Sequence, residues 1–376
     1  MGSEFLSCGN GPLERAKPFG LTRVGVVGCG YWGSKHVRVL AGLPGVEVTA
    51  IDDRSDRLLE MRTHFPSIGV ARRLSDVQDK LDAVVIATPP ESHGRIGQRA
   101  LRAGLHTLIE KPLTTTVAEA EALVEMANAS GTTLMVGNTF EYNAAVWKLK
   151  EVIASGELGR ILYIDTARLS LGAHQHDCNV IWDLAPHDLS ILSFLLDEFP
   201  ATVSVWAQRN VGDTHDDVAY LRLEFPRSSV SAFVHVSWLN PDKVRRVTVV
   251  GERKMAVYND LSDNERIRIY DKCATPAEIC DGPDQQAMPV TYRSGDITAP
   301  YVPFVEPLLV EDKHFVDCVR RGQRPKTPGE NGLQIVRALA ATDEARASGR
   351  PVRIHVPAVE HIESAHSSSF AGSVHG

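Results

Sequence analysis

The sequence Gly28-Cys29-Gly30-Tyr31-Trp32-Gly33 is the strongest indication of fold in the first part of this chain. It directly follows an apolar segment, residues 24–27, and opens a run with helical periodicity that continues to Leu40. A glycine-rich turn between a strand and a helix is the setting in which a G-x-G-x-x-G pattern binds the pyrophosphate of a dinucleotide. The sequence therefore predicts a dinucleotide site here rather than an ordinary turn.

Each glycine of this stretch has a separate task in such a site. Gly28 permits the tight turn, Gly30 lets backbone N–H groups approach the pyrophosphate, and Gly33 lets the helix pack closely on the strand. The phosphate charge would lie at the helix N-terminus, where backbone N–H groups have no partner within the helix. Tyr31 and Trp32 complete the expected cofactor-binding loop.

An acidic residue follows at the expected distance. Asp53 stands about 20 positions after Gly33, just beyond the next apolar run at 46–51. Its carboxylate can accept hydrogen bonds from the adenosine ribose and would repel the 2′-phosphate of NADP, which favours NAD as the cofactor. The adjacent Arg54 could accommodate that phosphate, so NADP remains the less favoured alternative.

Length and composition exclude several classes of function. A chain of 376 residues with 43% hydrophobic content can form two ordinary cores. The net charge of −7, without a basic face, argues against a nucleic-acid partner. No apolar run approaches the roughly 20 residues of a membrane helix, and no signal-peptide pattern is present, so no membrane partner is expected. Six cysteines without a C-x-x-C pair suit a reducing cytoplasm, where we expect the protein.

The fold class follows from how the pattern changes along the chain. From 23 to 137, apolar strands alternate with helical patterns, which predicts an α/β domain with a doubly wound parallel (Rossmann) sheet. The expected strands there are residues 24–27, 46–51, 83–88, 106–109 and 133–136. Within this part, Thr116-Val117-Ala118-Glu119 has the spacing of a capping box and should open a helix that runs to Asn128.

After about residue 139, long alternating strands predominate. They are expected at 161–171, 201–209, 218–225, 230–238 and 244–258. Their short turns predict an α+β domain with a large open, mostly antiparallel sheet, and helices at 183–196 and 310–321 should cover one face of it. Residues 274–300 are expected to form a long irregular excursion. The expected divisions are an N-terminal tag and flexible segment at 1–20, a dinucleotide domain at 21–140, a domain for substrate and oligomerisation at 141–355, and a disordered tail at 356–376.

Two clusters follow strands of the parallel sheet, where ligands bind at strand carboxyl ends. Thr88 and Pro89 should pass near the nicotinamide, together with His93, although capping the next helix is the more ordinary role for that histidine. Glu110 and Lys111 follow the next strand and are also expected among the cofactor-binding residues. The ammonium of Lys111 could hydrogen-bond a substrate hydroxyl and stabilise alkoxide charge, or it could be a plain surface lysine.

A third cluster enters an apolar helix. Asp183 and His187 are four residues apart, so they share a helix face. His187 is a candidate general base near neutral pH. The alternative is that Asp183 is an N-cap and His187 a buried structural histidine.

The segment before this helix is rich in histidine. His174, His176 and Cys178 alternate, as zinc ligands on an extended segment can, but no fourth ligand is evident and no metal is expected. Hydrogen bonding to substrate by His176 or Asn179 is the favoured role. Arg168 on the preceding strand is a candidate for a substrate phosphate, and an ordinary surface charge is equally plausible.

The glycine-rich loop, Glu110-Lys111-Pro112 and the later Asp183-x-x-x-His187, in this order, resemble the glucose-fructose oxidoreductase / inositol dehydrogenase family (Gfo/Idh/MocA) over about residues 22 to 350. The resemblance implies catalytic positions for Lys111, Asp183 and His187 and a substrate that is a sugar or cyclitol. The segments 182–188 and 236–239 look most like the branch of nucleotide-sugar 3-dehydrogenases and 3-ketoreductases. The resemblance also implies a homodimer or homotetramer formed through the open sheet.

We therefore expect an NAD(P)-dependent oxidoreductase of a secondary alcohol or ketone, with C3 of a nucleotide sugar as the favoured position. A dehydrogenase of a free sugar or inositol is the first alternative, and a dinucleotide-sensing regulator without catalytic activity is the second.

Overall fold

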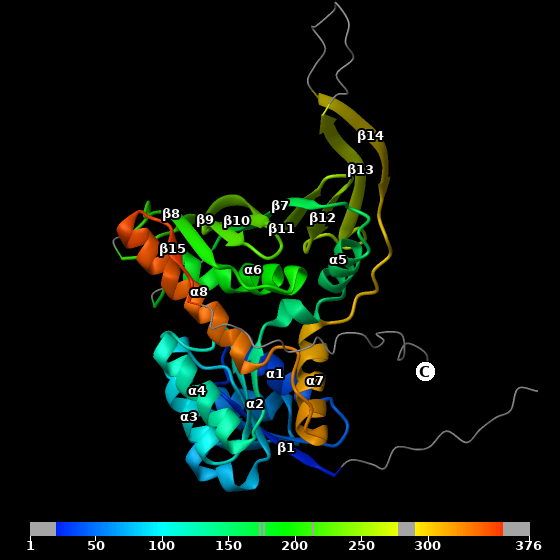
Figure 1. Ribbon diagram of the computed structural model, residues 1–376. Coiled ribbons are helices and arrows are strands. Elements are labelled where there is room, and N and C mark those ends of the chain that lie inside the picture. The colour runs from blue at the N-terminus through cyan, green and yellow to red at the C-terminus, as the bar shows by residue number, and fades with distance from the viewer. Residues whose placement is uncertain (1–19, 173, 176, 213, 277–289, 356–376) are drawn as a thin grey trace, which may run out of the picture.

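The computed structural model describes residues 20–172, 174–175, 177–212, 214–276 and 290–355. In this part of the chain, two sheets form two stacked domains, with the first domain below the second in the view of Figure 1. The first sheet has six strands in the order β3-β2-β1-β4-β5-β6, and the second has nine in the order β14-β13-β12-β11-β7-β10-β9-β8-β15.

The first domain is a parallel α/β sheet, as predicted. Every strand pair in it is parallel, and the order reverses between β1 and β4, which is the switch point at which such sheets bind ligands. Its strands are β1 (Thr22–Val27), β2 (Val46–Ile51), β3 (Gly69–Ala71), β4 (Ala83–Ile86), β5 (His106–Glu110) and β6 (Leu134–Gly137). Its helices and turns are α1 (Tyr31–Ala41), α2 (Ser55–His64), η1 (Leu74–Asp76), η2 (Gln78–Lys80), η3 (Pro90–Ser92), α3 (His93–Arg102) and α4 (Val117–Ser130).

The helix predicted from the capping box is present. Thr116 is the N-cap of α4, and its Oγ1 accepts a hydrogen bond from the backbone N–H of Glu119 at 3.3 Å. The carboxylate of Glu119 in turn accepts a hydrogen bond from the Thr116 hydroxyl. Strand β3 was not expected, because three residues are too few to show a periodic pattern.

The second domain is a mixed sheet with one parallel pair, β7 with β10, and antiparallel pairs elsewhere. Its strands are β7 (Ile161–Leu171), β8 (Thr202–Gln208), β9 (Val218–Phe225), β10 (Val230–Ser237), β11 (Leu239–Gly251), β12 (Met255–Asn259), β13 (Ile267–Pro276), β14 (Val290–Thr298) and β15 (Val352–Arg353). Its helices and turns are η4 (Thr139–Tyr142), α5 (Ala144–Ala154) and α6 (Val180–Leu196). One face of this sheet packs on α5 and α6, and the other faces away from the first domain (Figure 1).

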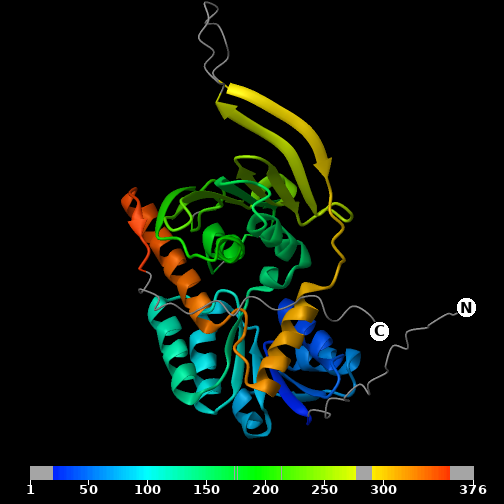
Figure 2. The same ribbon diagram turned by 45° about the vertical axis from the view of Figure 1, so that its right-hand side comes forward.

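Part of the segment 274–300, which was expected to be irregular throughout, forms a strand. Residues 290–298 form β14, which pairs with β13, and the two strands project beyond the rest of the sheet (Figure 2). Because nearly every described residue of β14 is exposed, the strand lacks the apolar alternation that would have revealed it. Residues 1–19, 277–289 and 356–376, including the predicted tag and tail, lie outside the described residues.

The predicted position of the helix at 310–321 is wrong. Helix α7 (Pro307–Arg321) packs on the first domain, where Phe315 and Val316 share a core with Val24 and Val37. The next helix, α8 (Gly329–Ser348), contacts both domains, because Leu333 joins the core of the first and Leu339 that of the second. The chain therefore returns to the first domain after forming most of the second sheet. None of the described helices has the length and apolar character needed to cross a membrane.

Candidate active site

Two positions of the glycine-rich loop, Gly28 and Gly33, leave no room for a side chain. Gly28 has a φ of +87°, and a Cβ there would lie 2.8 Å from the carbonyl oxygen of Ala87. A Cβ on Gly33 would lie 1.7 Å from the carbonyl oxygen of Gly28. No side chain caps α1 at Gly30, so the first backbone N–H groups of this helix are open to an anion. This cradle fits the pyrophosphate of NAD.

Two neighbouring aspartates after β2 have different positions. Asp52 supports the loop, because its Oδ2 accepts a hydrogen bond from the Cys29 N–H at 2.7 Å. Asp53 is exposed. The guanidinium of Arg54 is bound to Asp56, with Nη2 to Oδ2 at 2.5 Å. This ion pair competes with the role that Arg54 could have in binding a 2′-phosphate.

Arg57 was not singled out from the sequence. Its Nη1 donates to the carbonyl oxygen of Cys29 at 3.1 Å, so it braces the loop from α2. Tyr31 and Trp32 are both exposed at the start of α1, with Lys35 Nζ 4.0 Å and 4.6 Å from their ring centroids. A lysine four residues after Tyr31 is the helical spacing that could have suggested this contact.

His93 is a buried residue and is not open to solvent. It is 1% exposed, and its ring nitrogens lie 2.9 Å from the carbonyl oxygen of Pro112 and 2.8 Å from that of Thr88. Burial lowers the pKa of His93. His93 therefore ties together the loops that follow β4 and β5, while Pro89 is exposed on the first of them.

Glu110 connects the site to a buried charge cluster. Its Oε1 lies 3.1 Å from Nε2 of His36, and its Oε2 accepts a hydrogen bond from the Lys111 N–H at 3.1 Å. His36 is fully buried on α1 and also contacts Asp312 of α7. Burial alone would lower the pKa of His36, but the charges and hydrogen bonds of Asp312 and Glu110 raise it well above its ordinary value. Sequence reasoning did not find His36 or Asp312 as partners, because they come from distant parts of the chain.

The structure brings Lys111 to the helix that carries the other two catalytic candidates. Lys111 Nζ donates to the carbonyl oxygen of Asp183 at 2.9 Å and lies 3.8 Å from its Oδ1. Oδ2 of Asp183 accepts a hydrogen bond from Nε1 of Trp238 at 3.0 Å. Asp183 therefore contacts Lys111 of the first domain and Trp238 of the second. It lies in the first turn of α6 and is not the N-cap of that helix.

His187 lies one turn further along α6, half-buried, with its ring against Phe140 at a centroid distance of 5.1 Å. Desolvation lowers its pKa well below the ordinary value, and the charges of Lys111, Arg168 and Arg245 lower it further. His187 is therefore neutral near pH 7 and able to accept a proton. Pro186 lies inside this helix, because the helix begins at Val180, before the predicted start at 183.

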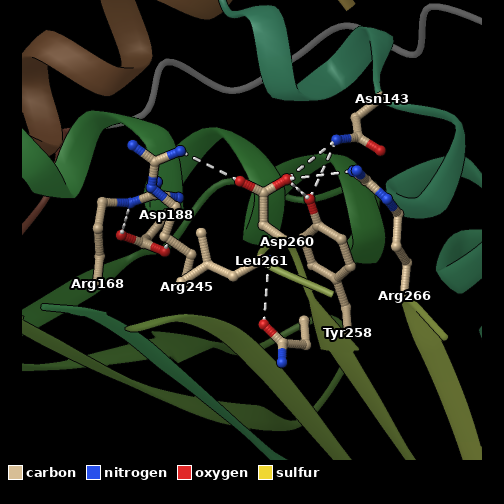
Figure 3. A network of polar contacts seen from close by, with 9 residues as sticks. Asn143, Arg168, Asp188, Arg245, Tyr258, Asp260, Leu261 and Arg266 are labelled. Carbon is tan, nitrogen blue, oxygen red and sulfur yellow. Dashed lines mark hydrogen bonds and ion pairs between the residues drawn. The ribbon is translucent and has the colours of Figure 1, made fainter. Parts of the chain in front are cut away.

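Lys111 and His187 line one pocket of about 450 Å³. Trp32 and Glu110 contribute its wall from the first domain, and Arg168 and Arg245 contribute from the second sheet. Arg168 is buried and bound to Asp188, with Nε to Oδ2 at 2.9 Å (Figure 3). Figure 3 also shows a separate contact between Arg245 and Asp260, residues that no motif had indicated.

Asn179 is the N-cap of α6, and its Oδ1 accepts hydrogen bonds from the N–H groups of Ile181 and Trp182. His176 lies outside the described residues. The ring of His174 lies 5.1 Å from that of Trp238, and burial raises the pKa of Cys178 to about 12. Within the described ranges, no group of three or more His, Cys, Asp or Glu side chains is placed to hold a metal ion.

Comparison with known proteins gives matches along most of the chain. Residues 22–138 match the model of the oxidoreductase family with an NAD-binding Rossmann fold, GFO_IDH_MocA, and residues 146–257 match a GFO/IDH/MocA C-terminal domain. Among curated proteins, the UDP-N-acetylglucosamine 3-dehydrogenase of Acidithiobacillus ferrooxidans is 27% identical over 79% of this chain and 92% of its own length. The D-apiose dehydrogenase of Paraburkholderia graminis is 24% identical over 88% of each chain.

Among solved structures, an oxidoreductase from Magnetospirillum magnetotacticum superimposes with a TM-score of 0.73 and 29% identity. It is described as a putative oxidoreductase, and the match covers 86% of this chain and 99% of that one. The first domain is thus an NAD-binding Rossmann domain, and its glycine-rich loop is the part whose shape fits that cofactor.

Proposed function

The chain belongs to the GFO/IDH/MocA family of NAD(P)-dependent oxidoreductases of sugars and polyols, and we propose that its substrate is a nucleotide sugar that reacts at C3. The observation that carries the proposal is the placement of Lys111 and His187 on one pocket that also reaches the glycine-rich loop through Trp32. The similarity to a UDP-N-acetylglucosamine 3-dehydrogenase supports the choice of substrate.

In the direction of oxidation, His187 takes the proton of the substrate hydroxyl while a hydride leaves the same carbon, which becomes a ketone. The chemistry that NAD supplies when bound is acceptance of this hydride. Lys111 donates a hydrogen bond to the reacting oxygen and stabilises its negative charge before the carbonyl has formed. Asp183 holds Lys111 through its carbonyl oxygen and carboxylate. In the direction of reduction, protonated His187 returns the proton to the oxygen.

The cofactor residues of this proposal are Gly28, Gly30 and Gly33 for the pyrophosphate and Asp53 for the ribose. The shape of the glycine-rich loop and the exposure of Asp53 support these assignments. Thr88 and Pro89 follow β4 beside the same loop, since the side chain of Thr88 would be 2.8 Å from a Cβ on Gly28.

The first alternative is a dehydrogenase of a free sugar or inositol. Relatives with those names match at similar identity, for example the myo-inositol 2-dehydrogenase of Thermotoga maritima at 24% over 88% of this chain. A test is to incubate the enzyme and NAD with UDP-N-acetylglucosamine, myo-inositol or D-apiose and to follow NADH at 340 nm. We expect the nucleotide sugar to give the highest kcat/KM and a 3-keto product by NMR. A higher kcat/KM for a neutral free sugar or inositol would exclude the nucleotide-sugar assignment.

We also propose a homo-oligomer formed through the open face of the second sheet. Exposed aromatic side chains cross this face, with Tyr163 6.3 Å from Phe233 and Trp206 5.8 Å from Tyr220 between ring centroids. A second copy of the chain would bury these rings, which otherwise face water. The cytoplasmic location expected from the cysteine pattern stays a prediction.

A further inference from the structure

Two arginines lie directly opposite each other on neighbouring strands of the second sheet. Arg168 of β7 and Arg245 of β11 are register partners in an antiparallel pair, and both line the pocket. Directly opposed residues of this kind have Cβ atoms about 4.5–5.5 Å apart, and like charges in such positions are destabilising. The sheet therefore places two positively charged side chains opposite each other in the pocket that Lys111 and His187 also line.

Arg168 is neutralised within the protein. Asp188 accepts from its Nε at 2.9 Å and from its Nη2 at 3.4 Å, and both residues are buried. The guanidinium carbon of Arg168 also lies 4.6 Å from the ring centroid of Phe140. Arg168 is thus held in place and has little capacity left for a ligand.

Arg245 is only partly neutralised. Its Nη1 donates to Oδ2 of Asp260 at 3.2 Å, and its side chain is 38% exposed. Asp260 is shared, because its Oδ1 also accepts from the Tyr258 hydroxyl at 2.7 Å and lies 3.8 Å from Nη1 of Arg266 (Figure 3). One carboxylate between two guanidinium groups leaves a positive charge. Among the described residues, Nε and Nη2 of Arg245 have no hydrogen-bond partner, so these two groups are available to another acceptor.

Further cations line the same pocket. Lys243 and Lys35 both do so, and among the described residues no carboxylate lies within 4.0 Å of either ammonium group. The pKa of Tyr31 is lowered, first by its hydrogen bond with Lys35 and to a smaller extent by the charges of Lys243 and Arg245. The cations of α1 and β11 therefore face a common space.

The remaining acidic residues of the pocket do not balance these charges. Glu110 is bound to His36, and Glu306 is bound to Arg38, which lies outside the pocket lining. We propose that Arg245, assisted by Lys243 and Arg266, binds an anionic group of the substrate, a carboxylate or a phosphate, in the pocket that His187 also lines. This inference rests on the proposed oxidoreductase function and narrows its substrates to anionic sugars.

The geometry suits such a group. Asp260 fixes one edge of the Arg245 guanidinium and leaves the other edge, which can form two parallel hydrogen bonds to the oxygens of a carboxylate or phosphate. Carboxylate and phosphate share this chemistry, so the ligand series must separate them.

The test is calorimetric titration of the NAD-saturated enzyme, so that the cofactor's own phosphates are already in place. The probes are N-acetylglucosamine, N-acetylglucosamine 1-phosphate, UDP-N-acetylglucosamine, glucose and glucuronate. We expect at least one anionic sugar to bind about tenfold or more tightly than its neutral counterpart, as one charge-assisted hydrogen bond implies. A gain for glucuronate alone identifies a carboxylate, and a gain for the phosphate esters identifies a phosphate.

The variant Arg245→Gln should abolish this preference for anions, and Lys243→Gln should reduce it. Arg246→Gln is the matched control, because Arg246 is the next residue along β11, is exposed, and points to the opposite face of the sheet. Thermal unfolding of the variants checks that each is folded. Lys243 is exposed, so Lys243→Gln should fold normally and can still test the preference for anionic sugars if Arg245→Gln does not fold. Equal affinity for neutral and anionic sugars, or equal losses in Arg245→Gln and Arg246→Gln, would overturn the anion site.

Turnover measured in parallel separates this inference from the proposed function. Anion binding that depends on Arg245, without hydride transfer to or from any probe, leaves the anion site standing and overturns the proposed reaction. Efficient turnover of myo-inositol, together with equal affinity for neutral and anionic sugars, overturns the anion site and leaves an oxidoreductase.

Discussion

Nδ1 of His36 lies 2.8 Å from Oδ1 of Asp312, although the two residues are 276 positions apart in the chain. Both side chains are fully buried, and the contact joins α1 to α7. Since His36 also contacts Glu110 beside Lys111, the last third of the chain supports the loop that carries a catalytic candidate.

Asp312→Asn should lower the free energy of unfolding by about 3 kcal/mol, because it leaves a buried imidazolium without one of its partners. Asp317→Asn on the same helix is the control, since Asp317 pairs only loosely with Arg321 near the surface and its loss should cost less than about 1 kcal/mol. Urea denaturation of both variants measures the difference. Similar losses of unfolding free energy in the two variants would show that the buried contact between His36 and Asp312 adds nothing to stability.

The stabilisation by His36 should depend on pH. Its pKa in the folded protein is raised by Asp312 and Glu110 above the unfolded value of about 6.5. Its contribution is therefore fully present below about pH 6.5 and is lost as the pH rises through the raised folded pKa. The gap in stability between wild type and a His36→Gln variant should narrow from pH 6 to pH 9. A gap that widens over this range would mean that His36 is neutral in the folded state.

His187→Ala should reduce kcat for oxidation by about 100-fold or more, because it removes the proton acceptor. In the wild type, activity should fall only at a pH well below 6.5, since the pKa of His187 is lowered and the base must be neutral. This fall in activity at low pH should be absent in His187→Ala. His235→Ala is the control, because His235 stacks on Tyr220 at a centroid distance of 4.0 Å on the open face of the second sheet. Near-normal kcat in His187→Ala would make His187 a structural residue.

Lys111→Met should also lower kcat by about 100-fold, because it keeps the aliphatic stem but removes the donor to the reacting oxygen. The dissociation constant of NAD should stay nearly unchanged. Combined with His187→Ala, the loss should be smaller than the product of the two single losses, as expected for residues that act on one oxygen. Lys148→Met, on the exposed side of α5, serves as the control. Independent, multiplicative losses would argue against a shared oxygen.

Asp53→Ala should weaken NAD binding and improve NADP binding relative to NAD by about tenfold, because one carboxylate no longer binds the ribose or repels a 2′-phosphate. Asp56→Asn should improve NADP binding alone, since it releases the guanidinium of Arg54 from its ion pair. Fluorescence titration with both cofactors measures these changes. Tighter binding of NADP than NAD by the wild type would contradict the assignment of Asp53.

Phe233→Glu should convert the proposed oligomer into monomers, because it places a charge among the exposed rings of the open sheet face. Leu59→Glu on α2 is the control, as Leu59 is 67% exposed in the other domain. Sedimentation velocity at micromolar concentration distinguishes the two. A wild type that sediments as a monomer would rule out the interface.

The elements that could be predicted from the sequence are those whose interactions are local. The glycine-rich turn between β1 and α1 and the Thr116 cap of α4 each depend on residues only a few positions apart, so their patterns predict them directly. Apolar alternation likewise revealed long strands such as β9, which has exactly the bounds expected for 218–225. The exposed strand β14 carries no such alternation and was missed.

Which of these elements contact one another depends on the packing of the whole chain. Lys111 reaches Asp183 across 72 residues, and α7 returns to the first domain to place Asp312 beside His36. The opposition of Arg168 and Arg245 depends on the register of β7 against β11, and a shift of one residue would direct one of these arginines to the other face of the sheet. Such register is set by the packing of whole elements against a shared core, which no single stretch of sequence contains.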